Sequence, residues 1–157
     1  MKKNKFSKNW IIKQNRDIYV KKSKLEGYRS RAVYKLIEIN DKFKLIKNNS
    51  LVVDLGAAPG SWSQYISRNF NNSKIISIDL KEIEPIKNSI HIKGDFTEEY
   101  QKLKIKKYFE KKVDLIISDM AVNTTGNKSV DHLKIISLIE TVFIVAEKHL
   151  KKSVLLQ

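Results

Sequence analysis

Four aspartates follow short apolar runs of the chain at nearly regular intervals. They are Asp54, Asp79, Asp95 and Asp119, with spacings of 25, 16 and 24 residues. An ionised carboxylate accepts hydrogen bonds from hydroxyl and amino groups and attracts cations. One such aspartate is ordinary in a loop or at a helix N-terminus, but four of them in a chain of net charge +14 indicate a shared ligand.

The glycine turn that follows Asp54 narrows the choice of ligand. It reads DLGAAPGS and lacks the G-x-G-x-x-G pattern that holds a dinucleotide pyrophosphate. Asp54 would also repel a pyrophosphate, so a nicotinamide-dependent dehydrogenase is disfavoured. S-adenosylmethionine has no phosphate and carries an ammonium and a sulfonium, so a carboxylate is a suitable neighbour. We therefore predict a site for this cofactor, in which Gly56 and Gly60 let the backbone approach the ligand.

Three of the aspartates have an expected partner on this cofactor. Asp54 can bind the ammonium group directly or through water. Asp79 ends the second apolar run, where ribose hydroxyls are bound in nucleotide-binding sheets. Asp95 can accept a hydrogen bond from the adenine amino group.

Alternating strands and helices must bring these aspartates together. We expect strands at 51–55, 74–79, 89–95, 113–119 and 153–157, and helices at 61–69, 97–110 and 131–150. This alternation is typical of a doubly wound, Rossmann-like α/β fold, in which a parallel sheet carries helices on both faces. Ligands of such sheets bind beyond the carboxyl ends of the strands, which is where the four aspartates fall.

The N-terminal region, residues 1–47, is the most basic part of the chain, and five aromatic residues lie among its lysines and arginines: Phe6, Trp10, Tyr19, Tyr28 and Tyr34. We expect a basic arm and two helices here, one at 17–26 and one that begins after Ser30. Such a surface binds RNA through phosphate contacts. A lysine-rich composition without a binding role is the alternative explanation. Together with the α/β core at 48–157, this region is predicted to form a single domain.

Composition excludes several other classes. The chain has no Cys, which excludes disulfide scaffolds, thiolate zinc sites and cysteine nucleophiles, and we expect no metal site. No apolar run approaches the ~18 residues of a membrane-spanning helix, and the basic N-terminus is not followed by an apolar segment as in a secretory signal. We expect a cytoplasmic monomer without membrane attachment.

Five segments resemble, in order, the motifs of the FtsJ/RrmJ family: YRSRAVYKLIEIN, VVDLGAAPGSWSQYI, ISIDL, IKGDF and IISDMAVNTTG. The resemblance extends over nearly all of the chain from about Trp10 onward. Members are S-adenosylmethionine-dependent 2′-O-ribose methyltransferases, and bacterial members modify the 23S RNA of the large ribosomal subunit. The resemblance implies methylation of a ribose, expected to be that of a uridine, during ribosome maturation.

The resemblance also implies roles for single residues. Cofactor positions of the family match Gly60, Trp62, Asp79, Asp95 and Asp119. Similar enzymes use a Lys-Asp-Lys-Glu tetrad for catalysis, whose first Lys matches Lys35 and whose Asp matches Asp119. Arg29, Arg31 and Lys35 are the expected RNA-binding residues, because they lie in the basic block before the first strand.

The chain departs from the family pattern in a few places. Ser61 replaces a common second glycine, and Val122 replaces the proline that usually follows DMA. The sequence ends at Gln157, so we expect the last strands to be missing, together with the second Lys and the Glu of the tetrad. Two interpretations remain open: a methyltransferase that binds its ligands but transfers slowly, and a non-catalytic RNA-binding or ribosome-assembly protein that retains the fold.

Overall fold

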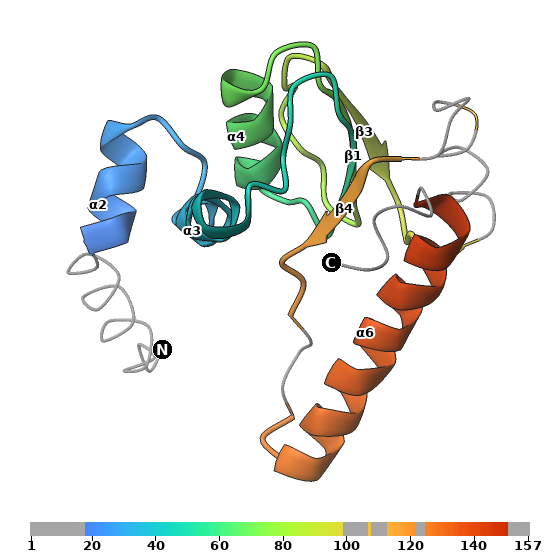
Figure 1. Cartoon of the computed structure of the whole chain (residues 1–157). Coiled ribbons are helices and arrows are strands. Elements are labelled where there is room, and N and C mark those ends of the chain that lie inside the picture. Colours follow the sequence, from blue (N-terminus) through green and yellow to red (C-terminus); the bar gives the residue numbers. More distant parts are fainter. Residues whose placement is uncertain (1–17, 99–106, 108–112, 122–124, 151–157) are drawn as a thin grey trace.

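Four parallel strands form the centre of the molecule in a computed structural model that describes residues 18–98, 107, 113–121 and 125–150 (Figure 1). The strands are β1 (Leu51–Leu55), β2 (Lys74–Asp79), β3 (Ser89–Lys93) and β4 (Leu115–Ser118). Their order in the sheet is β3-β2-β1-β4. The described helices are α2 (Ile18–Leu25), α3 (Val33–Phe43), α4 (Ser61–Asn69) and α6 (Lys128–His149).

Helices cover both faces of this sheet, which confirms the predicted doubly wound fold. On one face, α3 and α4 bury a core with side chains of β1, β2 and β4: Val33, Leu36, Val52, Trp62, Ile66, Ile75 and Ile117 are among its members. On the other face, α6 contributes Val145 to a second core: Val53, Leu55, Ile76, Ile78 and Ile92 are among the strand residues there. Burial on two sides explains why the strands are continuous apolar runs in the sequence.

Helices α2 and α3 are connected by a segment that contains a glycine turn. Gly27 has a φ of +67°, in the left-handed region, and the Tyr28 N–H donates to the Ser23 carbonyl, 2.8 Å away, which closes α2. The second helix begins at Val33 instead of directly after Ser30, and no side chain caps it. Ser30 forms a hydroxyl–hydroxyl bond of 2.8 Å with Ser61 at the start of α4.

The long helix α6 begins three residues before the predicted position. Asn127 accepts hydrogen bonds from the N–H groups of Ser129 and Val130 and so caps the helix. The Asp131 carboxylate accepts from the N–H and hydroxyl groups of Thr125, at 2.7 and 2.8 Å, and these bonds hold its pKa below the usual range. The predicted arm at 1–15, most of the helix at 97–110 and the strand at 153–157 lie outside the described residues.

Candidate active site

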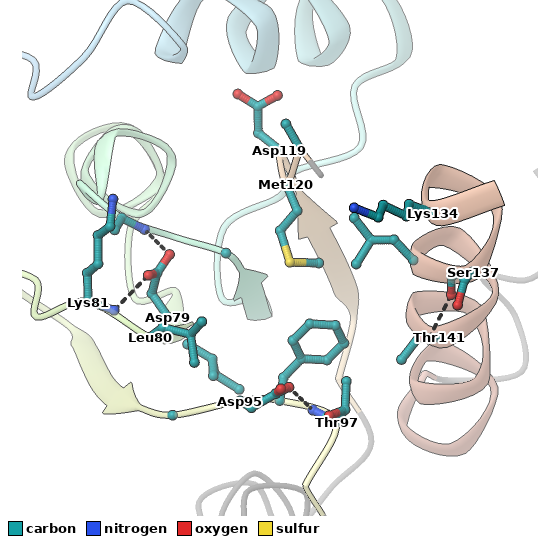
Figure 2. Close-up of a pocket in the computed structure, with 17 residues that line it drawn as sticks. Asp79, Leu80, Lys81, Asp95, Thr97, Asp119, Met120, Lys134, Ser137 and Thr141 are labelled. Carbon is teal, nitrogen blue, oxygen red and sulfur yellow. Dashed lines mark hydrogen bonds between the residues drawn. The ribbon is translucent and has the colours of Figure 1, made fainter. Parts of the chain in front are cut away.

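A cavity of about 850 Å³ lies beyond the carboxyl ends of the strands (Figure 2). It brings together four of the residues predicted from the sequence: Gly56, Asp79, Asp95 and Asp119. Asp79 ends β2, and the other three lie just after β1, β3 and β4, so the parallel arrangement itself creates this cluster of three carboxylates.

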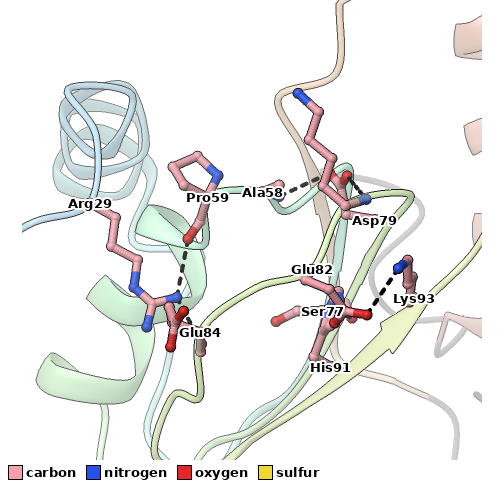
Figure 3. Close-up of polar contacts among 10 residues, drawn as sticks. Arg29, Ala58, Pro59, Ser77, Asp79, Glu82, Glu84, His91 and Lys93 are labelled. Carbon is pink, nitrogen blue, oxygen red and sulfur yellow. Dashed lines mark hydrogen bonds and ion pairs between the residues drawn. The ribbon is translucent and has the colours of Figure 1, made fainter.

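Asp79 is held in place by two backbone groups. One oxygen of its carboxylate accepts from the Ala58 N–H at 2.9 Å, and the other accepts from the Lys81 N–H at 2.8 Å (Figures 2 and 3). Ala58 belongs to the glycine turn after β1, so Asp79 ties this turn to the end of β2. Each carboxylate oxygen retains a second lone pair, which leaves Asp79 able to accept from two hydroxyl groups.

Asp95 is fixed by a contact with a residue close to it in the sequence. Its Oδ1 accepts from the Thr97 N–H at 2.8 Å, a local turn in which the aspartate bonds to the backbone two residues on. Phe96, which is buried, lies in the wall of the cavity beside it. A flat apolar surface next to a carboxylate acceptor suits a planar ring that bears an amino group.

Gly56 permits a close approach between the turn and the residue after Asp119. Its φ is +70°, and a Cβ placed there would run into the side chain of Met120. Only glycine therefore satisfies both the backbone conformation and the contact. The Met120 side chain reaches into the cavity in the space that this glycine leaves (Figure 2).

Lys35 and Asp119 form an ion pair between segments that are 84 residues apart in the sequence. The Lys35 Nζ lies 2.7 Å from Asp119 Oδ1, and the two side chains are 64% and 32% exposed. Lys35 extends from α3, whereas Asp119 follows β4 and lines the cavity. The two residues that were matched to the catalytic tetrad are therefore in contact, with the ammonium group accessible from solvent.

Asp54 lies beneath the turn, at 1% exposure, and does not line the large cavity. Burial raises the pKa of Asp54 to about 7, although hydrogen bonds from Ser63 oppose the shift. The Ser63 hydroxyl lies 2.7 Å from Asp54 Oδ2, and bonds of 2.7 and 2.8 Å continue the chain to Ser77 and Ser89. Each hydroxyl has one hydrogen. When Asp54 is ionised, Ser63 donates to it, Ser77 to Ser63 and Ser89 to Ser77.

Trp62 and Gly60 also lie outside the large cavity. The Trp62 indole N–H donates to the Ala32 carbonyl at 2.7 Å, so the buried ring joins α4 to the start of α3. Together with Asp54 and Asp119, Trp62 lines a much smaller cavity of about 40 Å³. Gly60, with a φ of +97°, is closely packed on the other side of the turn, where a Cβ would lie 2.9 Å from atoms of Arg29 and Ile83.

Arg29, an expected RNA-binding residue, donates hydrogen bonds to three backbone carbonyls. Its Nη1 lies 3.1 Å from the Pro59 oxygen and 2.8 Å from the Glu84 oxygen (Figure 3). Its Nη2 lies 3.0 Å from the Pro85 oxygen. The guanidinium thus connects the glycine turn to the loop after β2. The planar guanidinium of Arg29 is suited to contacting several carbonyls at once. Arg31, another expected RNA-binding residue, is exposed.

Helix α6 contributes a wall of the cavity that was not predicted from the sequence. Lys134, Ser137 and Thr141 line it from the side opposite Asp79, and the Thr141 hydroxyl donates to the Ser137 carbonyl at 2.8 Å (Figure 2). The three positions are spaced by three and four residues, which places them on one face of a helix. The regular spacing of these polar residues, in a helix predicted to cover the sheet, could have indicated that one side of the helix faces a cavity.

The family comparison covers most of the chain. The model of the FtsJ-like methyltransferase family matches residues 28–156. A ribosomal RNA large subunit methyltransferase E from Pelagibacter ubique is 61% identical over 131 residues, which are 83% of this chain and 64% of that protein. A protein of the same name from Rickettsia akari is 50% identical over 94% of this chain and 67% of its own length. The chain thus spans about two thirds of the length of these curated relatives.

A solved structure supports the same assignment. A crystal structure of a protein described as a ribosomal RNA methyltransferase, from Plasmodium falciparum, is 38% identical and superposes with a TM-score of 0.73, over 79% of this chain and 73% of the other. Among the helices described in our structure, none combines the length and apolar character that a membrane crossing requires. Sequence motifs, sheet order and these similarities agree, and the chain belongs to the family of FtsJ-like methyltransferases.

Proposed function

We propose that this protein is an S-adenosylmethionine-dependent 2′-O-ribose methyltransferase that acts on the 23S RNA of the large ribosomal subunit during ribosome maturation. The observation that carries the proposal is the 2.7 Å ion pair between Lys35 Nζ and Asp119 Oδ1, since Asp119 also lines the large cavity. The names of the relatives from Pelagibacter ubique and Rickettsia akari support ribosomal RNA of the large subunit as the substrate. Such a substrate places the protein in the cytoplasm.

The large cavity fits the proposed cofactor in size and in charge. Its volume of about 850 Å³ lies within the ~300–1,000 Å³ of small-molecule sites. Asp79 would hold the ribose hydroxyls, Asp95 the adenine amino group, and Asp119 the positively charged methionine end, with Asp54 acting from below the turn. S-adenosylmethionine, when bound, supplies an activated methyl group.

The Lys35–Asp119 pair would act on the ribose hydroxyl. A neutral hydroxyl is a weak nucleophile, so its oxygen needs a partner that takes the proton or stabilises the negative charge that develops. The exposed Nζ of Lys35 can donate a hydrogen bond to that oxygen while its bond to Asp119 fixes its position. Asp119 thereby links the residue that touches the substrate to the cofactor cavity.

The second candidate function is RNA binding without catalysis, as in a ribosome-assembly protein. The net charge of +14 favours it, because phosphate contacts require only exposed cations. Both functions predict binding of RNA, and only the first predicts that methyl groups reach a ribose oxygen.

Transfer of a labelled methyl group decides between the two functions. The protein is incubated with radiolabelled S-adenosylmethionine and large ribosomal subunits from cells that lack this methylation, and the labelled nucleotide is identified after digestion. We expect one 2′-O-methylated nucleotide in 23S RNA. Binding of cofactor and RNA without any labelled ribose would refute the methyltransferase and support the non-catalytic function.

A further inference from the structure

A second cavity opens next to Lys35, on the side of the molecule formed by α2 and α3. Its volume is about 360 Å³, and its walls are Tyr19 of α2 together with Arg31, Ala32, Tyr34, Lys35 and Glu38 of α3 and the turn before it. Lys35 borders this cavity and is bonded to Asp119, which borders the large one. The proposed catalytic lysine therefore stands between the two cavities.

Aromatic rings form one wall of this second cavity. The rings of Tyr19 and Tyr34 are 5.2 Å apart with an angle of 42° between their planes. The buried Tyr34 is fixed because its hydroxyl donates to Glu26 Oε2 at 2.9 Å, whereas Tyr19 is 47% exposed. Exposed aromatic faces of this kind stack with the bases of single-stranded RNA.

The charges around the rings match a nucleotide in two different ways. Lys35 and Glu38 share one face of α3, because they are spaced by three residues, and Arg31 of the preceding turn lines the same cavity. The Arg31 guanidinium suits a phosphate next to the bound base, whereas Lys35 is the cation that faces the ribose of the neighbouring nucleotide. The Glu38 carboxylate would repel phosphates, but it can accept hydrogen bonds from N–H groups of a base. Among the described residues, no hydrogen bond or ion pair engages this carboxylate.

Of the four RNA bases, guanine is the one that satisfies a carboxylate with two adjacent donors. Its Watson–Crick edge presents the N1–H and the 2-amino group side by side, whereas adenine, cytosine and uracil place one donor group next to an acceptor. Two parallel N–H···O bonds to an ionised acceptor are strong and specific.

We propose that the cavity formed by Tyr19, Arg31, Tyr34, Lys35 and Glu38 binds a guanine of the RNA strand, adjacent to the nucleotide whose ribose faces Lys35. The guanine stacks on Tyr19 and pairs with the Glu38 carboxylate. The proposal rests on the proposed function in one respect, namely that the ligand is RNA. It adds a base-specific contact outside the large cavity, on the helix that carries Lys35.

Short RNA oligonucleotides test this guanine site directly. Affinities of the full chain for the fluorescein-labelled heptamers UUUGUUU, UUUIUUU and UUUUUUU are measured by anisotropy at one salt concentration; inosine (I) lacks only the 2-amino group. We expect the guanine heptamer to bind about tenfold more tightly than the inosine heptamer, the effect of one hydrogen bond to a charged group. Equal affinities for the two would overturn the proposal.

Variants of α3 supply the matched control. Glu38→Gln and Asp41→Asn each remove one exposed carboxylate from this helix, so they relieve phosphate repulsion similarly, but only Glu38 lines the cavity. Glu38→Gln should abolish the discrimination between guanine and inosine, and Asp41→Asn should preserve it. Tyr19→Ala should weaken binding of the guanine heptamer about tenfold, whereas Tyr19→Phe should not. A Glu38→Gln variant that keeps the full discrimination would also overturn the site.

Methyl transfer, measured on the same preparations, separates this inference from the proposed function. Transfer to 23S RNA combined with equal heptamer affinities would reject the guanine site alone. Discrimination of guanine without any transfer would support the site and reject the methyltransferase.

Discussion

The two cavities that meet at the Lys35–Asp119 pair differ in how their functional groups are held. In the large cavity, backbone N–H groups fix the carboxylates of Asp79 and Asp95. In the smaller cavity, Arg31 of the turn before α3 and Glu38 of α3 are exposed side chains. Backbone contacts depend on the strand ends and turns, so the proposed cofactor region, made of the large cavity and the glycine turn, is determined by the fold. The region proposed to face RNA depends on side chains, which can be exchanged without altering the fold.

This difference implies that variants should fall into two groups: those that weaken cofactor binding and those that slow methyl transfer to RNA or weaken RNA binding.

The largest expected effect belongs to Lys35. Lys35→Ala should lower the rate of methyl transfer ~10²–10⁴-fold, the usual cost of losing a general base or an oxyanion donor. Its affinity for S-adenosylmethionine, measured by calorimetry, should remain that of the parent. Lys42→Ala, which removes another exposed lysine of α3, is the control and should leave both quantities unchanged. A loss of cofactor affinity in Lys35→Ala would break the division between the two regions.

Asp54 belongs to the cofactor region and should make the stability of the protein pH-dependent. Its pKa rises from the ordinary 3.8 to about 7 on folding, so the folded state holds the proton more tightly than the unfolded chain. The stability that this proton provides is present in full below about pH 4 and is lost as the pH rises through 7. Over that range the free energy of unfolding should fall by on the order of 4 kcal/mol relative to Asp54→Asn.

Urea titrations of the parent and Asp54→Asn between pH 4 and pH 8 measure this difference. The other carboxylates are common to both proteins, so their contribution cancels in the comparison. A constant difference across the whole range would mean that Asp54 carries the same charge in the folded and unfolded states.

Substitution of Asp79 should lower the affinity for S-adenosylmethionine and leave the affinity for RNA unchanged. Asparagine has the same shape but one acceptor oxygen, so Asp79→Asn cannot hold the Ala58 and Lys81 N–H groups and two ribose hydroxyls together. We expect the affinity for S-adenosylmethionine to fall about tenfold or more, the effect of one hydrogen bond to a charged group. Glu82→Gln, three residues later and outside the cavity wall, should bind the cofactor as the parent does. Unchanged affinity in Asp79→Asn would remove this residue from the site.

Substitution of Arg29 has the smallest expected effect and tests whether this residue belongs to the proposed cofactor region or to the region proposed to face RNA. It precedes α3, on the RNA-facing side in sequence, but its guanidinium contacts the carbonyls of the cofactor turn and the loop after β2. Arg29→Lys keeps the charge and loses the fork, so cofactor affinity should fall several-fold, corresponding to ~0.5–1.5 kcal/mol per lost hydrogen bond, while RNA affinity stays the same. Arg31→Lys should leave cofactor affinity unchanged. A decrease in RNA affinity alone in Arg29→Lys would return this residue to the RNA surface.

The sequence predicted the sheet and the three cavity carboxylates because both follow from local patterns. Continuous apolar runs mark strands that are buried on both faces, and an aspartate at the end of such a run falls at the carboxyl edge. Asp54 is the exception, because it lies inside β1, where it is paired with Ser77. The carbonyls that Arg29 contacts, the serines that reach Asp54 and the α6 wall of the cavity were not predicted. In each of these cases the partners come together only through the tertiary arrangement, from segments as far as 56 residues apart for Arg29 and Pro85.

The serine chain beneath the turn also protects the sheet against slippage. Asp54 is paired with Ser77 across β1 and β2, and Ser63 of α4 joins their side chains. A shift of β2 by one residue would turn Ser77 to the opposite face and place an isoleucine beside Asp54. A mispaired strand would thus leave the buried Ser63 hydroxyl, which donates to Asp54, without the hydrogen bond from Ser77, and an unpaired buried polar group is unfavourable. Asp79 lies two residues beyond Ser77 on the same strand. The strand register that the Ser77 hydroxyl favours therefore also places the Asp79 carboxylate next to the Ala58 N–H.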